Sequence, residues 1–150
     1  SSGDYAMAAT FYRECLSVAR QIGQRTAILL ALSGLGEIAC AQGEYSRASA
    51  SLQAALRIGV EIQAMPRILS ILVGMANLAL QRGALEQVVA LVTFPLHHRA
   101  SSVATRTRAS GLLSELTDRL PPETLRACEA RSHQQGLPAL VSALLAESKE

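Results

Sequence analysis

The chain of 150 residues has few of the residue types that stabilise small disulfide-rich or aromatic-cored folds. It contains no tryptophan, and aromatic residues make up only 3% of it, whereas apolar residues make up 49%. A core must therefore be built from aliphatic side chains and alanine, which suits closely packed helices. A chain of this length buries about 68 to 70% of the surface that its unfolded form exposes, so the fold requires neither a metal nor a disulfide.

Cysteine is also scarce. Cys15, Cys40 and Cys128 are odd in number, lie far apart and sit in apolar segments. This pattern argues against a disulfide framework and predicts reduced, buried thiols in a cytoplasmic protein. Polar residues interrupt every apolar run before it reaches the roughly 18 to 20 residues of a membrane-spanning helix, and the first residues do not form a signal peptide. We therefore expect a cytoplasmic protein with no membrane partner.

The charge is nearly balanced, at +2, and Lys149 is the one lysine among 14 basic residues. Such a balance does not require nucleic acid as a partner. The sequence contains neither a Gly-x-Ser-x-Gly nor a His-Glu-x-x-His motif, and its acidic residues are scattered singly along the predicted helices. We therefore predict that the chain is not an enzyme.

Two groups of residues imitate ligand sites. His97, His98, Cys128 and His133 could be combined as metal ligands, but adjacent helical residues point about 100° apart, so the first two cannot share one face. Residues 34–39 imitate the Gly-x-Gly-x-x-Ala dinucleotide fingerprint, yet the segment before them has helical spacing and the copy at 74–79 lacks the second glycine. We expect no metal and no cofactor, and we assign these glycines to close helix packing.

The chain instead contains a repeat of 40 residues. The tripeptides Gly3-Asp4-Tyr5, Gly43-Glu44-Tyr45 and Gly83-Ala84-Leu85 follow one another at this interval. A shift by the same interval superimposes Leu16 on Leu56, Ile28 on Ile68, Leu32 on Leu72 and Gly34 on Gly74. A fixed period of this size indicates one supersecondary unit stacked on copies of itself. The sequence thus predicts an all-α solenoid of helical hairpins.

The apolar spacing predicts helices at residues 4–22, 25–42, 44–62 and about 67–82. The glycine of each tripeptide is expected to lie in a turn just before a helix, and at Gly43 and Gly83 this turn follows another helix. Pro95 should end or kink the next helix early, because proline lacks a backbone donor. After a polar connection at 97–105, further helices are expected at about 105–119, 122–134 and 138–147.

This pattern predicts a single domain over residues 1–150. It consists of a half repeat at 1–22, a repeat at 23–62, a degenerate repeat at 63–98 and C-terminal capping helices at 99–150. Terminal elements of a solenoid need such a cap. The first predicted helix has no cap before it, so we expect the chain to be a fragment of a larger protein.

The repeat at residues 23–62 carries the pattern of a known family. Its residues are Leu32, Leu35-Gly36, Ala39, Gly43, Tyr45, Ala48, Leu52 and Ala55, and a weaker copy follows at Leu72, Met75-Ala76, Ala79, Gly83, Leu85 and Val88. The sequence resembles the tetratricopeptide repeat family, whose usual period is 34 residues. The longer period is similar to that of sensor regions in bacterial multidomain signalling and transcriptional regulators. The resemblance implies a superhelix of hairpins that binds partners without catalysis.

The resemblance also implies where a partner binds, namely the inner face formed by the first helix of each hairpin. The corresponding residues are Leu30, Ser33, Glu37, Ala41, Ser70, Val73, Asn77 and Gln81. This face lacks the lysine with which family members clamp a peptide carboxylate. We expect a groove that binds a protein segment or a small effector for a larger bacterial regulator.

Two alternatives stay open. The first helix could pair with a preceding repeat or with another copy of the chain through Tyr5, Tyr12 and Leu16, which would make it a structural assembly element. The segment 97–108 could contact nucleic acid. Its basic residues are His97, His98, Arg99, Arg106 and Arg108. No aromatic residue interleaves them for base stacking, so nucleic acid ranks third.

Overall fold

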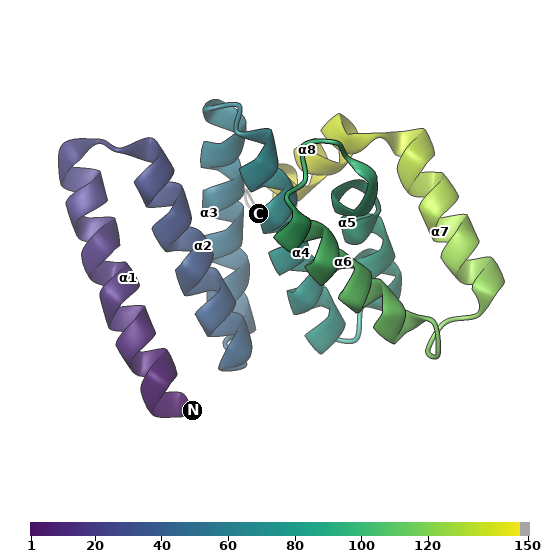
Figure 1. Ribbon diagram of the computed structural model, residues 1–150, viewed down its shortest axis with the longest axis horizontal. Coiled ribbons are helices and arrows are strands. Elements are labelled where there is room, and N and C mark those ends of the chain that lie inside the picture. Colours follow the sequence, from purple (N-terminus) through teal and green to yellow (C-terminus); the bar gives the residue numbers. More distant parts are fainter. Residues whose placement is uncertain (148–150) are drawn as a thin grey trace. The chain divides into compact units, whose positions relative to one another are not determined.

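The computed structural model describes residues 1–147, and every regular element in this range is a helix. The helices are α1 (Ser2–Ile22), α2 (Arg25–Ala41), α3 (Tyr45–Glu61), α4 (Met65–Gln81), α5 (Leu85–His97), α6 (Val103–Leu116), α7 (Pro122–Gln135) and α8 (Leu137–Glu147) (Figure 1). The chain divides into two compact units, unit 1 (Ser1–Ala64) and unit 2 (Met65–Glu150). The single domain over residues 1–150 stays a prediction.

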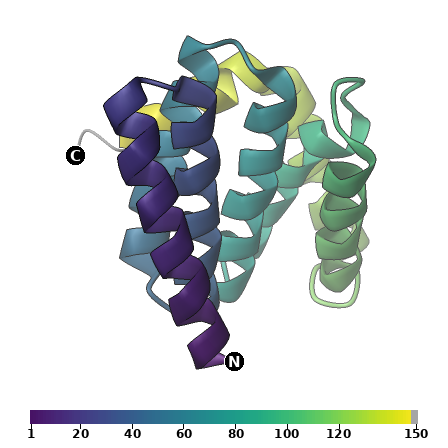
Figure 2. The ribbon, with the colours of Figure 1, turned by 60° about the vertical axis from the view of Figure 1, so that its left-hand side comes forward.

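Unit 1 consists of α1, α2 and α3, and α2 packs against both of the others. The turn between α2 and α3 is the predicted glycine turn: Gly43 has a φ of 76°, and the N–H of Glu44 donates to the carbonyl of Ala39 at 2.8 Å. Leu29, Leu52 and Leu56 are fully buried in this unit. Figure 2 brings α1 forward and shows that it lies on α2 with its other side uncovered by the helices of unit 1.

Two glycines of α2 allow this close packing. A Cβ added to Gly34 would lie 2.5 Å from Cζ of Tyr12 in α1, and one added to Gly36 would lie 2.8 Å from Cγ of Leu52 in α3. Both separations are shorter than van der Waals contact. The packing role that the sequence assigns to these glycines is therefore confirmed.

Unit 2 is built around α5. This helix packs against α4, α6 and α7, and α8 packs against α7. The side chains that α5 buries most completely are Val88, Val89, Leu91, Val92 and Pro95. Gly83 has a φ of 77° and forms the turn before α5, as the repeat predicts. Helices α6 and α7, which follow α5 in the sequence, thus pack around it together with α4.

The first glycine of the repeat does not form a turn, so that prediction is wrong. Gly3 lies inside α1, which begins at Ser2 rather than at residue 4. The Oγ of Ser1 accepts the N–H of Asp4 at 3.3 Å and donates to Oδ2 of the same residue at 2.8 Å. This serine and aspartate cap satisfies the first turn of the helix, which lets the helix include the glycine.

Helix α5 ends early, as Pro95 predicts. It includes the proline and ends at His97, where the predicted polar connection begins, and with 13 residues it is shorter than α4 with 17. The carbonyl of Pro95 accepts the hydroxyl of Ser101 at 2.7 Å, and the N–H of His98 donates to the carbonyl of Phe94 at 2.8 Å. These bonds hold the end of the helix beyond the proline. Helix α6 accordingly begins at Val103, two residues earlier than predicted.

Candidate functional site

Four of the predicted groove residues form a line along the outside of α2. Leu30, Glu37 and Ala41 are exposed and Ser33 is half-buried, whereas the positions on the other sides of the helix are mostly buried. We call these four residues the α2 stripe. They lie at intervals of three and four residues, which places them on one side of a helix.

The α2 stripe combines apolar and polar groups. The side chain of Leu30 is 41% exposed at one end of the line. The Oγ of Ser33 is buried without a hydrogen-bond partner. Burial raises the pKa of the Cys40 thiol beside this line, and the charge of Glu37 raises it further. Glu37 is the charged residue among the four of the α2 stripe.

The other four predicted residues lie on α4 in unit 2. Ser70 and Asn77 are half-buried and Gln81 is exposed, but Val73 is fully buried. Val73 therefore offers no side-chain surface to a partner. A continuous groove that joins these residues to the α2 stripe stays a prediction.

The predicted assembly residues lie on the side of α1 that packs within unit 1. Leu16 is buried, and the ring of Tyr12 covers Gly34 of α2. Tyr5 is 38% exposed near the start of the helix. An interface through these three residues stays a prediction, but Tyr12 and Leu16 have little surface left to contribute to it.

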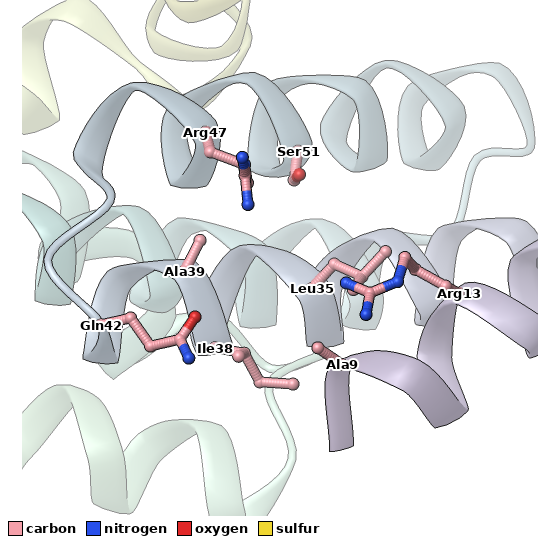
Figure 3. A pocket seen from close by; sticks show the side chains of 8 residues that line it. All are labelled: Ala9, Arg13, Leu35, Ile38, Ala39, Gln42, Arg47 and Ser51. Atoms are coloured by element: carbon pink, nitrogen blue, oxygen red, sulfur yellow. The ribbon is translucent and has the colours of Figure 1, made fainter. Parts of the chain in front are cut away.

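A pocket of about 210 Å³ lies in unit 1 between α1, α2 and α3 (Figure 3). It is lined by Ala9, Arg13, Leu35, Ile38, Ala39, Gln42, Arg47 and Ser51. The residues that α2 contributes lie on the side of the helix away from the α2 stripe, because each residue advances the helix by about 100°. The sequence analysis missed this pocket, since its arginines belong to two helices whose proximity no motif reveals.

Both arginines of this pocket have partners on their own helix or turn. Nη1 of Arg47 lies 2.8 Å from Oε2 of Glu44, and Nη2 of Arg13 donates to Oγ1 of Thr10 at 3.4 Å. In Figure 3, Arg47 and Ser51 extend from α3 toward α2, and Gln42 lies at the end of α2 beside Ile38. The pocket thus has a polar rim whose arginines are already engaged.

The residues considered as metal ligands take up other contacts. Among residues 1–147, no group of three or more histidine, cysteine or acidic side chains is placed to hold a metal. The rings of His97 and His133 lie 6.5 Å apart, and the thiol of Cys128 donates to Oε1 of Glu86 at 3.4 Å. Arg131 donates to the sulfur of Cys128 and to the same carboxylate, and the first of these bonds contributes most to the raised pKa of its guanidinium.

Within the basic segment 97–108, Arg106 bonds to the backbone of the loop between α5 and α6. Nη2 of Arg106 donates to the carbonyl oxygens of His98 at 3.2 Å and of Arg99 at 3.5 Å. Its guanidinium therefore contributes to the connection between α5 and α6. Among the helices of residues 1–147, none combines the length and hydropathy that crossing a membrane requires.

Residues 1–59, which comprise α1, α2 and most of α3, match the family model of the tetratricopeptide repeat. No curated protein and no solved structure is significantly similar to the chain. The match and the helices of the structure together confirm the predicted all-α fold of helical hairpins. The family identified from the glycine, tyrosine and alanine pattern is thus confirmed, and residues 1–59 are tetratricopeptide repeat sequence.

Proposed function

We propose that the chain is a noncatalytic protein-interaction module of a larger bacterial regulator, and that the α2 stripe binds a protein segment. The match to the tetratricopeptide repeat supports a protein-interaction module, because repeats of this kind form extended binding surfaces. One observation carries the second part: Leu30, Glu37 and Ala41 are exposed on one side of α2 within the matched region, and the half-buried Ser33 lies between them.

The chemistry of the α2 stripe defines the segment that fits it. Leu30 offers an apolar contact, and Glu37 offers a carboxylate to a basic side chain or to an N–H donor. The two residues lie about 10 Å apart along the helix, at 1.5 Å per residue. A complementary segment therefore carries an apolar residue and a donor at that separation, which corresponds to about two turns of a helix or about three residues of an extended strand.

The rigidity of α2 favours binding. The buried side of the helix is fixed by α1 and α3, so the exposed side chains project from a backbone that does not have to be ordered when a partner arrives. Preorganisation of this kind reduces the entropic cost of association. The α2 stripe thus suits a partner that binds by side-chain contacts on a helical surface.

The pocket between α1, α2 and α3 is small for an effector. Ligand pockets for drug-sized molecules usually measure about 300 to 1,000 Å³, whereas this pocket measures about 210 Å³. It also lies away from the α2 stripe, so it does not compete with the proposed contact of a protein segment along α2.

The test is a selection of peptides from a random phage-displayed library on the immobilised chain, followed by affinity measurements on synthetic copies. We expect Glu37→Ala to weaken the selected peptides by at least about tenfold, because a hydrogen bond to a charged group contributes about 1.5 to 3 kcal/mol. The exposed Glu123→Ala on α7 is the matched control and should leave affinity unchanged. Unchanged affinity in Glu37→Ala, with unchanged thermal unfolding, would place the binding site elsewhere.

A further inference from the structure

The outward side of α1 carries a line of large apolar side chains. Met7 is 74% exposed, Phe11 60%, Val18 55% and Ile22 70%. They are separated by four, seven and four residues, which keeps them on one side of the helix. We call these four residues the outer α1 stripe.

This stripe is distinct from the side of α1 that packs within unit 1. The buried residues of α1 are Ala9, Leu16 and Ala19, and within this unit α1 packs chiefly against α2. A helix on the surface of a soluble domain normally carries polar side chains on its outward face. Contiguous exposed apolar side chains in that position indicate an interaction surface.

We infer that the outer α1 stripe binds the same stripe of a second copy of the chain, with the two helices antiparallel. The stripe is symmetric about the point between Glu14 and Cys15: Phe11 and Val18 lie equally far from this point along the chain, and so do Met7 and Ile22. A twofold interface requires a surface that is complementary to itself in this way.

The side-chain sizes favour the antiparallel direction. In that arrangement Phe11 of one copy lies against Val18 of the other, and Met7 lies against Ile22. Each large, unbranched or aromatic side chain thus meets a β-branched one, and facing large and small residues interdigitate well. Parallel helices would instead place each residue against its own copy.

The charges of α1 do not drive the pairing. Asp4, Arg13, Glu14 and Arg20 cancel in sum, but the helical period places the two acids on the side of the stripe. By the helical period, both arginines lie on the opposite side from the stripe. The two Glu14 carboxylates meet near the twofold axis, where like charges oppose binding. Glu14→Gln should therefore strengthen the pair.

The contact is one pair of helices. The 21 residues of α1 span about 32 Å, so the interface is small and the dimer should be reversible. Sedimentation velocity over about a hundredfold range of protein concentration should show a shift from monomer to dimer as the concentration rises. A chain that remains monomeric at every concentration would overturn the inference.

The identical substitution at two valines tests the surface. Val18 lies in the stripe, whereas Val103 is 79% exposed on α6 in unit 2. We expect Val18→Glu to weaken the dimer by at least about tenfold, because a buried, unpaired charge is costly at an interface, and Val103→Glu to leave it unchanged. Circular dichroism establishes that both variants are folded. Dimerisation that resists Val18→Glu, or that Val103→Glu abolishes equally, would contradict the assignment.

Cross-linking tests the direction. In a Cys15→Ser background, the remaining Cys40 and Cys128 are buried. Met7→Cys and Ile22→Cys variants should cross-link through a short bismaleimide when mixed, and neither should cross-link alone, because equivalent positions lie about 22 Å apart along antiparallel helices. Cross-linking of each variant with itself, without the mixed product, would establish a parallel pair and overturn the proposed arrangement.

Discussion

Helices α2 and α4 occupy the same place in the repeat, yet they expose different surfaces. Leu30 and Glu37 of α2 are exposed, whereas the corresponding Ser70 and Asn77 of α4 are half-buried. The largest contrast is between the half-buried Ser33 and the fully buried Val73. The repeat fixes the side of the helix on which a residue lies, but the neighbouring helices decide whether that side is surface or core.

The two units differ in the same way at α1 and α5, which occupy equivalent places in the repeat. Within unit 1, α1 packs chiefly against α2 and keeps an apolar outward side, whereas α5 in unit 2 packs against α4, α6 and α7. The added helices of unit 2 thus supply the burial that α1 lacks in unit 1. For this reason the proposed interaction surfaces lie on unit 1, and the following variants test that difference.

The largest expected effect is at Val73. Val73→Ser gives α4 the side chain that α2 has at the same repeat position. It should lower the free energy of unfolding by about 3 kcal/mol, because buried methyl groups are lost and a hydroxyl is buried without a partner. Urea denaturation measures the change. A loss below about 0.5 kcal/mol, which is ordinary for surface substitutions, would mean that the position is not core.

The glycines of α2 should differ from each other. Gly36→Ala places a methyl group against the buried Leu52 and should lower the free energy of unfolding by about 2 kcal/mol. Gly34→Ala meets only the end of the half-buried Tyr12 ring, which can turn aside, so its cost should be smaller.

A double-mutant measurement sharpens this contrast. In a Tyr12→Ala background, Gly34→Ala should stabilise the chain by up to about 1 kcal/mol, which is the difference in helix propensity. The corresponding cost of Gly36→Ala should persist in that background. Equal effects at both glycines in both backgrounds would show that these helices do not approach as closely as described.

Ser33→Ala should change the free energy of unfolding in the opposite direction to Val73→Ser. Removing a buried hydroxyl without a partner should leave stability unchanged or raise it by about 1 kcal/mol. The same variant should weaken peptides selected on the α2 stripe if the hydroxyl bonds to them. A clear loss of stability, measured by thermal unfolding, would show that Ser33 is structural.

The smallest expected effect is a pH dependence confined to unit 1. Cys40 lies on α2 where α4 has Leu80, and burial followed by the Glu37 charge raises its thiol pKa. Its contribution to stability is complete below the ordinary thiol pKa of about 8.5 and is lost as the pH rises through the raised value. The free energy of unfolding should therefore fall less steeply in Cys40→Ala than in the parent between neutral and alkaline pH. Equal slopes would contradict the assignment.

The sequence predicted the helices well, because the apolar spacing and the glycines at 43 and 83 depend on local chemistry. It misplaced Gly3, since the cap formed by Ser1 and Asp4 outweighs the repeat pattern there. The early end of α5 followed from Pro95, although the bond between Ser101 and the carbonyl of Pro95 could not be read from the repeat.

The candidate surfaces were predicted less completely. The residues of the α2 stripe follow from the resemblance to the tetratricopeptide repeat, but the burial of Val73 depends on which helices surround α4. The outer α1 stripe was missed because only the exposure of Met7, Phe11, Val18 and Ile22 distinguishes them from core residues. Exposure depends on tertiary neighbours, which a single repeat does not specify.

Titration of the isotope-labelled chain with the tightest selected peptide, followed by backbone NMR, tests the central claim most directly. We predict chemical-shift changes centred on Leu30, Ser33, Glu37 and Ala41. Changes centred instead on the pocket side of α2, at Leu35, Ile38 and Gln42, would contradict the claim that the α2 stripe is the binding surface.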